Sequence, residues 1–468
     1  MSKSRLDLLT RFPWLKEAIK SRLWQPAAML LTLSFFVLVI LTGLLGTPAG
    51  SKNFGIIFVW IVWWAVLIVV LIPFFGRLWC AICPIPGPGE WLQRRGIISR
   101  VPGKLRTLGW RWPRPLRNIW LQNAGFLMMA VFSTMILTRP LLTGWLLLGF
   151  LMLSVSFGIL FQKRVFCRYV CPVGGFIGLY SLLSPLELRV KDVAVCREHK
   201  TKDCLVGTSS SYGCPWLVYP GTLKRNAYCG LCAECVRACP KDNVGLTLRP
   251  FGSDLLVEKE RRMDEAFKAF IMLSCSLLYS VVLLGPWGWL KDLANMETVS
   301  GWALYATGFL AVNLLVVPGL FWLTTVVARH LSGLHAPVHR LFVDHAYGLV
   351  PLGLAGWIAF SLSFIFVNGS YVIPVLSDPF GWGWDLIGTS RVPWTPLALG
   401  FLPALQVITL LVGLVFSITT VYRIAQQHRT AFAGRTSVPS GDRAWWETLP
   451  TAGFATAVTL LFLWVFLG

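Results

Sequence analysis

The stretch CGLCAECVRACP, residues 229–240, decides how this chain is interpreted. Its four cysteines follow the spacing C-x2-C-x2-C-x3-C, and a proline follows the last of them. Thiolates at this spacing hold [4Fe–4S] clusters. The stretch belongs to a chain of 468 residues in which 55% of the residues are hydrophobic, and the mean hydropathy is +0.65. We therefore expect an iron–sulfur site that is attached to a membrane protein and carries single electrons.

Apolar runs close to the length that spans a bilayer recur along the chain. They predict an all-α polytopic membrane protein with about nine transmembrane helices. The first run is expected to be a span and not a cleaved signal peptide, because a second span follows it at once. The predicted spans are residues 24–46, 54–76, 119–138, 141–161, 266–290, 301–327, 346–367, 397–421 and 450–468.

Basic residues are distributed unevenly between the two ends of these spans. With the N-terminus inside, all but four of the 42 Lys and Arg residues fall on the cytoplasmic side. This bias predicts a bacterial or archaeal inner (cytoplasmic) membrane protein, with the N-terminus and the cysteine-rich segment cytoplasmic and the C-terminus outside. The net charge of +21 then reflects topology and contact with anionic lipids, and we expect no nucleic-acid partner.

Three parts can be distinguished along the chain. Residues 1–186 contain four spans, arranged as two hairpins. Residues 187–262 form a small cytoplasmic ferredoxin-like insertion with seven cysteines. Residues 263–468 contain five spans, no cysteine cluster and no assigned role. Because eleven of the twelve cysteines are expected on the reducing cytoplasmic side, they indicate metal sites and not disulfides.

The two hairpins of the first part each end in a cysteine pair followed by proline. The sequences are RLWCAICPIPG at residues 77–87 and KRVFCRYVCPVGG at residues 163–175, and they indicate an internal duplication. The duplication would bring four thiolates to one membrane face, those of Cys80, Cys83, Cys167 and Cys171. Four thiolates suit a third cluster or a tetrahedral zinc ion. Alternatively, the pairs give single ligands to the other clusters, or act as a dithiol redox pair.

The insertion supplies ligands for two [4Fe–4S] clusters. In two-cluster ferredoxins, the cysteine before proline binds the other cluster. By that rule the first cluster is held by Cys214, Cys229, Cys232 and Cys235. The second is held by Cys196, Cys204 and Cys239, and it lacks one thiolate. The missing ligand is His199, Asp203 or a membrane-edge cysteine, unless Cys196 and Cys204 bind nothing.

Two histidines of the last part are candidates for a further role. His345 and His428 are predicted at similar depth, near the inner ends of antiparallel helices. They suit axial ligation of a b-type haem. The alternatives are hydrogen bonding in a quinone pocket, or an interfacial position in a cytoplasmic loop.

Four spans with two cytoplasmic cysteine-pair-proline motifs, followed by a ferredoxin segment, resemble the NapH/NosR-type membrane polyferredoxins. The resemblance covers residues 24–262, and CRYVCPVG at residues 167–174 matches the family's C-x3-C-P element. It implies a membrane subunit of a quinol dehydrogenase, with quinone as substrate and [4Fe–4S] clusters as carriers. Cys80 and Cys83 depart from the pattern, because two residues separate them and not three.

The leading hypothesis is therefore a membrane electron-transfer subunit within a larger respiratory complex. It would couple the quinone pool to other membrane or periplasmic redox subunits. A second hypothesis is an accessory or regulatory polyferredoxin that supports metal-centre assembly or maturation of a reductase. A third is a solute transporter with an iron–sulfur sensor, which the scarcity of polar residues in the spans disfavours. Nucleotide-binding and hydrolase motifs are absent from the sequence.

Overall fold

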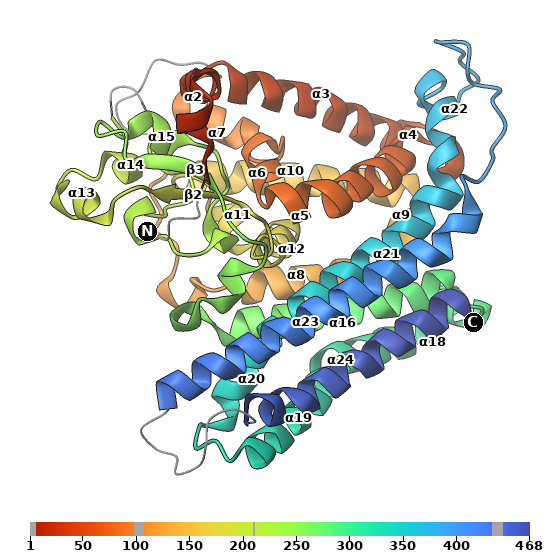
Figure 1. Cartoon of the computed structure of the whole chain (residues 1–468). Coiled ribbons are helices and arrows are strands. Elements are labelled where there is room, and N and C mark those ends of the chain that lie inside the picture. Colours follow the sequence, from red (N-terminus) through yellow and green to blue (C-terminus); the bar gives the residue numbers. More distant parts are fainter. Residues whose placement is uncertain (1–5, 98–105, 209–210, 433–442) are drawn as a thin grey trace. The chain divides into compact units, whose positions relative to one another are not determined.

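The computed structural model describes residues 6–97, 106–208, 211–432 and 443–468. Helices make up most of this part of the chain (Figure 1). Eight helical segments among the described residues are long and apolar enough to cross a membrane, which makes the chain a multi-pass membrane protein. They are Trp24–Leu45, Phe54–Phe75, Pro140–Leu160, Met263–Leu284, Val299–Ser332, Val338–Ser377, Leu399–Ala431 and Ala444–Leu467.

The predicted span at residues 119–138 differs from the others. It consists of two shorter helices, α8 (Trp120–Val131) and α9 (Ser133–Thr138), which are separated at Phe132. Phe132 has φ −92° and ψ 10°, outside the helical region, and the hydroxyl of Thr134 donates to the carbonyl of Ala294 at 2.8 Å. Because neither helix has the length of a span, the described residues show eight candidate spans where the sequence predicted nine.

The chain divides into two compact units, which are described separately. Unit 1 contains Met1–Leu45, Val70–Gln122 and Thr143–Asp254. Unit 2 contains Gly46–Val69, Asn123–Leu142 and Leu255–Gly468. The three-part division expected from the sequence stays a prediction.

Unit 1 combines membrane helices with a small sheet of three antiparallel strands in the order β1-β3-β2. In the register, Leu6 of β1 and Leu186 of β2 both pair with Leu248 of β3. The strands are β1 (Leu6–Asp7), β2 (Leu186–Val190) and β3 (Val244–Leu248). The helices are α1 (Leu8–Arg11), α2 (Pro13–Lys20), α3 (Trp24–Leu45), α5 (Ile72–Phe75), α6 (Leu78–Ile82), α7 (Gly87–Arg94), η4 (Arg114–Leu116), α10 (Pro140–Leu160, in large part), α11 (Val165–Tyr169), α12 (Pro172–Tyr180), α13 (Val193–Glu198), α14 (Asp203–Val206), η5 (Pro220–Thr222), η6 (Asn226–Tyr228), α15 (Glu234–Ala238) and most of η7 (Ser253–Leu256).

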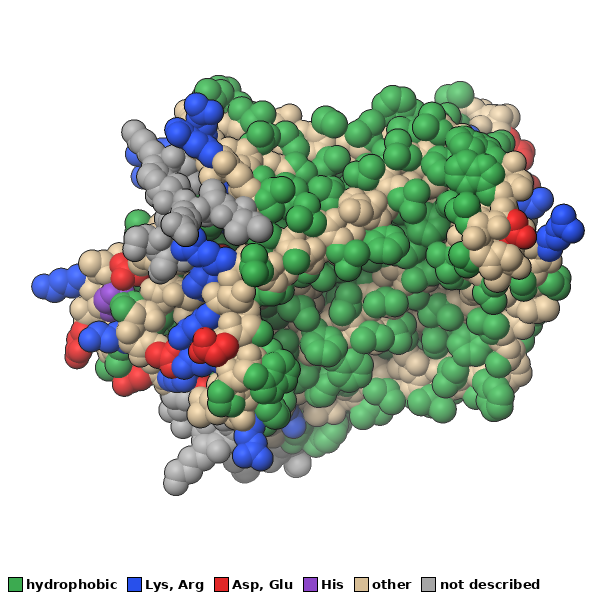
Figure 2. Space-filling view, turned by 90° about the horizontal axis from the view of Figure 1, so that it is seen from above, with side chains coloured by type: hydrophobic (Ala, Val, Ile, Leu, Met, Phe, Trp, Pro, Cys, Tyr) green, Lys and Arg blue, Asp and Glu red, His purple; other side chains and the backbone are tan. Residues whose placement is uncertain are grey.

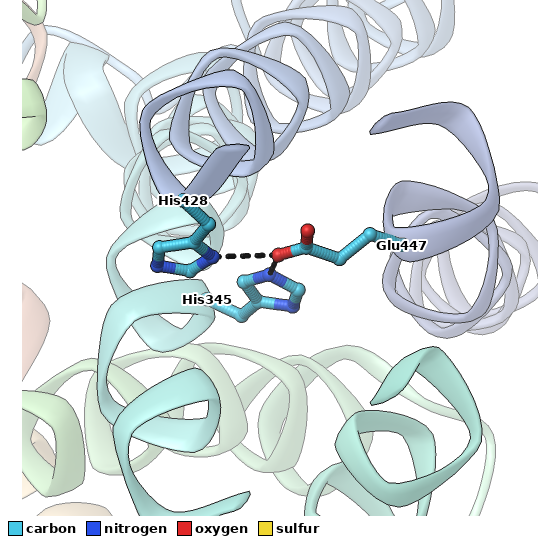
Figure 3. A group of neighbouring side chains, drawn as sticks. All are labelled: His345, His428 and Glu447. Atoms are coloured by element: carbon cyan, nitrogen blue, oxygen red, sulfur yellow. Dashed lines mark hydrogen bonds and ion pairs between the residues drawn. The ribbon is translucent and has the colours of Figure 1, made fainter. Parts of the chain in front are cut away.

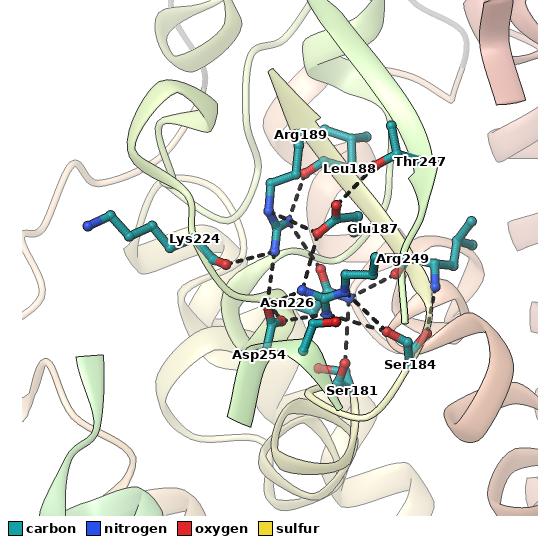
Figure 4. A network of polar contacts seen from close by, with 12 residues as sticks. Ser181, Ser184, Glu187, Leu188, Arg189, Lys224, Asn226, Thr247, Arg249 and Asp254 are labelled. Carbon is teal, nitrogen blue, oxygen red and sulfur yellow. Dashed lines mark hydrogen bonds and ion pairs between the residues drawn. The ribbon is translucent and has the colours of Figure 1, made fainter. Parts of the chain in front are cut away.

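A buried network of charged side chains fixes the sheet to the segment that precedes Cys229 (Figure 4). Arg249 pairs with Glu187 at 3.1 Å and with Asp254 Oδ2 at 2.7 Å. Asp254 accepts a hydrogen bond from the backbone N–H of Asn226 at 2.5 Å. The Asn226 side chain in turn donates to the carbonyl of Leu186 at 2.8 Å. Since buried charges are tolerated when they are paired and hydrogen bonded, this network holds the start of the cysteine loop in place.

Unit 2 is built from long helices around an aromatic core. Trp357 of α21 (Val350–Asn368) donates from Nε1 to the carbonyl of Met272 in α16 at 2.9 Å, and Tyr279 packs edge-on against it at 5.3 Å. Gly413 allows α23 to approach α21 closely, because a Cβ there would lie 2.3 Å from that of Ala355. The elements are α4 (Phe54–Ile56), η2 (Ile57–Trp63), part of η3 (Val66–Leu71), most of α8, α9, η8 (Glu258–Glu260), α16 (Met263–Leu284), α17 (Gly288–Ala294), α18 (Val299–Ala311), η9 (Val312–Val316), α19 (Val317–Ser332), α20 (Val338–Ala346), η10 (Tyr347–Leu349), α21, η11 (Gly369–Tyr371), α22 (Val372–Ser377), η12 (Leu399–Phe401), α23 (Leu402–Phe432) and α24 (Arg443–Leu467).

Large apolar side chains are exposed on the helices of this unit. Leu304 and Leu315 are each 70% exposed on the segment from α18 to η9, and Leu323 of α19 is 60% exposed. Figure 2 shows a different face, the one that is uppermost in Figure 1, and hydrophobic side chains cover much of that face as well. Contiguous apolar surface of this extent is unfavourable in water and is the surface that lipid covers.

Candidate iron–sulfur sites and a histidine–glutamate cluster

The membrane-edge cysteines come together in unit 1 and form site A, defined by Cys80, Cys83, Cys167 and Cys171. Cys80 lies in α6 and Cys83 caps the end of that helix, while Cys167 lies in α11 and Cys171 caps the start of α12. Burial and the neighbouring Cys80 and Cys171 thiols raise the pKa of Cys83. Burial and the other three thiols likewise raise the pKa of Cys167. The four thiols therefore lie within electrostatic reach of one another.

Two arginines line site A, one from each cysteine repeat. Arg164 donates from Nη1 to the carbonyl of Cys80 at 2.5 Å, and its backbone N–H donates to the carbonyl of Pro215 at 3.0 Å. Arg77 donates to the carbonyl of Ala227, and its guanidinium lies 4.4 Å from the ring centroid of Trp216. Arg77 is buried, and its Nε and Nη2 atoms have no hydrogen-bond partner among the described residues. Buried cationic donors of this kind suit a site that gains negative charge.

Site B is formed by Cys214, Cys229, Cys232 and Cys235. Burial and Cys214 raise the pKa of Cys232, and burial with Cys229, Cys232 and Cys214 raises that of Cys235. This is the grouping that the ferredoxin spacing predicts. Ligation of a cluster by these thiols stays a prediction.

A buried hydrogen-bond donor without a partner among the described residues lies beside the loop between Cys229 and Cys232. The indole Nε1 of Trp216 is buried and has no hydrogen-bond partner among the described residues. A Cβ on Gly230 would lie 2.0 Å from this Nε1 atom, so only glycine fits between the indole and the loop. An unpaired N–H at this position can donate to the sulfur of a cluster, and hydrogen bonds to the sulfurs are one means by which proteins tune these groups. The residues of site B therefore fit a [4Fe–4S] cluster.

Site C is formed by Cys196, Cys204 and Cys239. Burial, Cys196 and Cys239 raise the pKa of Cys204 to about 11. Asn243 links the other two thiols, because its side-chain N–H donates to Cys196 Sγ and its backbone N–H to Cys239 Sγ, both at 3.3 Å. His199, a candidate fourth ligand, hydrogen bonds to Thr201 at 2.9 Å and lies 3.6 Å from Asp203, the other candidate. The structure thus groups three thiols here.

The spacing of the sulfur atoms bears on zinc. A tetrahedral Zn²⁺ with Zn–S bonds of about 2.3 Å brings its sulfurs to about 3.8 Å from one another. Among the described residues, the group whose ligand atoms all lie within 4.8 Å of one another is His345, His428 and Glu447, and no three cysteines form such a group. A cluster holds its thiolates farther apart, because four iron atoms lie between them. In the described part of the chain, no three cysteine thiols thus lie as close together as they would around a zinc ion.

His345 and His428 come together, as their similar predicted depth suggested. Their rings stack with centroids 5.9 Å apart, and the carboxylate of Glu447 lies between them (Figure 3). His428 lies within α23, which extends to Phe432 and not only to residue 421 as expected. All four ring nitrogens contact Thr451, Glu447 or Asp344. Because Glu447 fills the space that a macrocycle would need, the residues do not fit a haem.

The sequence analysis did not single out Glu447 or Asp344. Both are buried acidic residues near the ends of predicted spans. Their position in the sequence could have identified them. An acidic residue in or beside an apolar helix is energetically unfavourable, so it usually belongs to a functional site or is paired with another polar group.

Two regions of the chain, residues 56–104 and 143–190, match the family model described as "4Fe-4S binding domain". The first contains Cys80 and Cys83, and the second contains Cys167 and Cys171. The double match supports the internal duplication and assigns both halves of site A to one kind of domain. The chain is thus a multi-pass membrane protein with a 4Fe–4S binding domain.

Two relatives share parts of the sequence. "Putative electron transport protein YccM" of Escherichia coli (strain K12) is 31% identical over 83 residues, which are 17% of this chain and 21% of the relative. "Uncharacterized protein MJ0750" of Methanocaldococcus jannaschii is 26% identical over 193 residues, which are 38% of this chain and 74% of the relative. The chain therefore spans 21% of the length of the Escherichia coli relative. No solved structure matches the chain.

Proposed function

We propose that this protein transfers electrons between the quinone pool and a redox partner through [4Fe–4S] clusters, as a NapH/NosR-type polyferredoxin within a respiratory complex. Sites A and B hold one cluster each, and site C holds a third with a non-cysteine fourth ligand. The name of the Escherichia coli relative, an electron transport protein, agrees with this role.

The observation that carries the proposal is the continuity of the three sites. Arg164 connects site A to site B, because its side chain contacts Cys80 and its backbone contacts Pro215, the neighbour of Cys214. The backbone N–H of Cys214 then donates to the carbonyl of Cys204 in site C at 2.9 Å. The thiol groups of neighbouring sites also act on one another, since Cys204 contributes to the raised pKa of Cys235. Three cluster sites joined in series form a path for single electrons.

The position of site A in the chain supports quinone as the reactant at the membrane end. Cys80 follows the span Phe54–Phe75 closely, and Cys167 follows the span Pro140–Leu160. We place this face at the cytoplasmic side, on the distribution of Lys and Arg. Oxidation of a quinol there releases two protons to water and two electrons, which enter the clusters one at a time. The reverse reaction reduces a quinone with electrons from a cytoplasmic donor, and the midpoint potentials decide the direction.

The test is an EPR-monitored redox titration of anaerobically purified protein in nanodiscs, followed by addition of a menaquinol or ubiquinol analogue. We expect signals from three clusters, at least one with a midpoint near the quinone couple, and reduction of the clusters by the quinol. Cys232→Ser should remove the site B signal and stop electron flow to site C. Cys171→Ser should remove the site A signal and stop entry from quinol.

Cys275→Ser is the matched control, because Cys275 is buried in α16 of unit 2, outside the three sites, and contacts Asn313 at 3.2 Å. It should leave every signal unchanged. Quinol-linked reduction that survives in Cys232→Ser at the rate of the parent protein would refute the path. Clusters that titrate normally but do not exchange electrons with any quinol would refute the quinone step and favour an accessory role.

A further inference from the structure

A cluster of ligand-type side chains lies in unit 2 and has no part in the cysteine sites. It consists of His345 of α20, His428 of α23 and Glu447 of α24 (Figure 3). The ligand atoms lie within 4.8 Å of one another, and all three residues are buried. His345 Nε2 and His428 Nδ1 approach the same atom, Oε1 of Glu447, at 2.9 and 2.7 Å. Two imidazoles and one carboxylate thus converge from three different helices.

In each imidazole, the ring nitrogen that does not face Glu447 lies within hydrogen-bond distance of another oxygen atom. His345 Nδ1 lies 3.1 Å from Thr451 Oγ1, and His428 Nε2 lies 2.8 Å from Asp344 Oδ2. Asp344 is itself 3.4 Å from Arg261 Nη1. Histidines that bind metals almost always donate their second ring N–H to a carboxylate or another oxygen, which fixes the tautomer and the ring orientation. Both histidines show this arrangement.

The partners of His428 favour a positive charge at the ring. Both of its nitrogens face carboxylate oxygens, those of Asp344 and Glu447. A neutral imidazole has one N–H only, so its other nitrogen would present a lone pair to a carboxylate. A second proton on the ring, a proton on one of the two carboxylates, or a metal ion on Nδ1 removes this conflict. Such a cation also compensates the Glu447 carboxylate, which is buried within an apolar helix.

We propose that His345, His428 and Glu447 bind one divalent first-row transition-metal ion. Two imidazole nitrogens and a carboxylate oxygen suit Zn²⁺, Fe²⁺ or Mn²⁺. With bonds of about 2.1 Å, six-coordinate geometry separates neighbouring ligand atoms by about 3.0 Å and tetrahedral geometry by about 3.4 Å. The N–O distances of 2.7 and 2.9 Å are close to the first value. The ion ties α20, α23 and α24 together at one end of unit 2 and leaves coordination positions open.

The test compares the metal content of the anaerobically purified full chain with its content of acid-labile sulfide. Iron, zinc and manganese are measured by mass spectrometry, and acid-labile sulfide counts the clusters, because a mononuclear site has no sulfide. We expect about one metal ion per chain beyond the cluster iron, as the three-ligand site requires. His345→Gln and Glu447→Gln should lose this ion and keep all of their sulfide. His339→Gln is the control, since His339 is exposed on the same helix, α20.

A second variant covers the case in which loss of a ligand unfolds unit 2. Thr451→Val keeps all three ligands, and valine has nearly the shape of threonine. The substitution removes only the oxygen atom that contacts His345 Nδ1. After removal of the ion with a chelator, Co²⁺ titration followed by its visible spectrum should show binding weaker by about 10- to 100-fold in this variant. Metal content fully explained by sulfide, with no Co²⁺ spectrum in the parent protein, would overturn the proposal. An ion that persists in Glu447→Gln and His345→Gln would overturn it equally.

Discussion

Arg164 binds Glu90 through two parallel hydrogen bonds, from Nε to Oε1 at 2.6 Å and from Nη2 to Oε2 at 3.0 Å. Both side chains are buried. Glu90 belongs to the first region that matches the 4Fe–4S binding domain and Arg164 to the second. The pair therefore joins the two cysteine repeats behind site A, and it holds the guanidinium that also contacts Cys80.

Removal of one partner of this pair should be strongly destabilising. Glu90→Gln leaves the Arg164 guanidinium buried without its main counter-charge, and breaking a buried pair in this way costs about 3 kcal/mol or more. We expect a lower apparent unfolding temperature in nanodiscs and a loss of site A iron. Glu17→Gln provides a surface control that removes the same charge from α2. A variant with the stability and iron content of the parent would contradict the role of the pair.

The same pair predicts how stability depends on pH. Burial alone would raise the pKa of Glu90, but Arg164 and Arg94 lower it below the usual value of 4.5. Because the folded pKa lies below the unfolded one, the stabilisation is complete above pH 4.5 and is lost as the pH falls through the folded value. The difference in unfolding temperature between the parent and Glu90→Gln should therefore be constant above pH 4.5 and shrink below it. A difference that grows on acidification would show that the sign is wrong.

The arrangement of the cysteines was accessible from the sequence because ligand spacing is a local property. The run from Cys229 to Cys239 fixes its own geometry, and the proline after Cys214 marks a partner cysteine. The mutual approach of the pairs in site A followed from the duplication alone. Spacing cannot supply a fourth ligand for site C, because that depends on how the loop around His199 folds back.

Two other features, strand β1 and the polar start of the helix that carries Glu447, could not be predicted because the sequence patterns that would indicate them are too short. Strand β1 has two residues, Leu6–Asp7, too few for a period-two pattern to be recognised. The helix that carries Glu447 begins at Arg443, before the apolar run that predicted a span from residue 450. Hydropathy marks the lipid-facing length of a helix and not its ends, so the polar residues at those ends were missed.

Gly230 should be intolerant of even one added methyl group. A Cβ there would lie 2.0 Å from Trp216 Nε1, and overpacking of a buried contact typically costs about 1–3 kcal/mol. Gly230→Ala should therefore displace the loop of Cys229 and Cys232 and lower the occupancy of site B, measured as iron and sulfide per chain. The double variant Gly230→Ala with Trp216→Leu should recover much of the loss. Equal loss in the single and double variants would show that backbone conformation, and not the indole, excludes alanine.

Asn243 should set the midpoint potential of site C. Its side-chain N–H donates to Cys196 Sγ at 3.3 Å, and such a hydrogen bond stabilises the more negative, reduced form of a cluster. Asn243→Asp replaces this donor with an acceptor. A hydrogen bond worth about 1 kcal/mol corresponds to about 40 mV for one electron, so the midpoint should fall by at least this amount.

The measurement is an EPR redox titration that resolves the individual signals. The potentials of sites A and B should stay within error. Among the cysteines of the described residues, Asn243 contacts only those of site C. Asn118→Asp introduces the same charge at a solvent-exposed turn and should shift no potential. If Asn243→Asp moved every midpoint equally, the effect would be one of net charge. An unshifted site C would mean that Cys196 carries no cluster, and site C would lose its assignment.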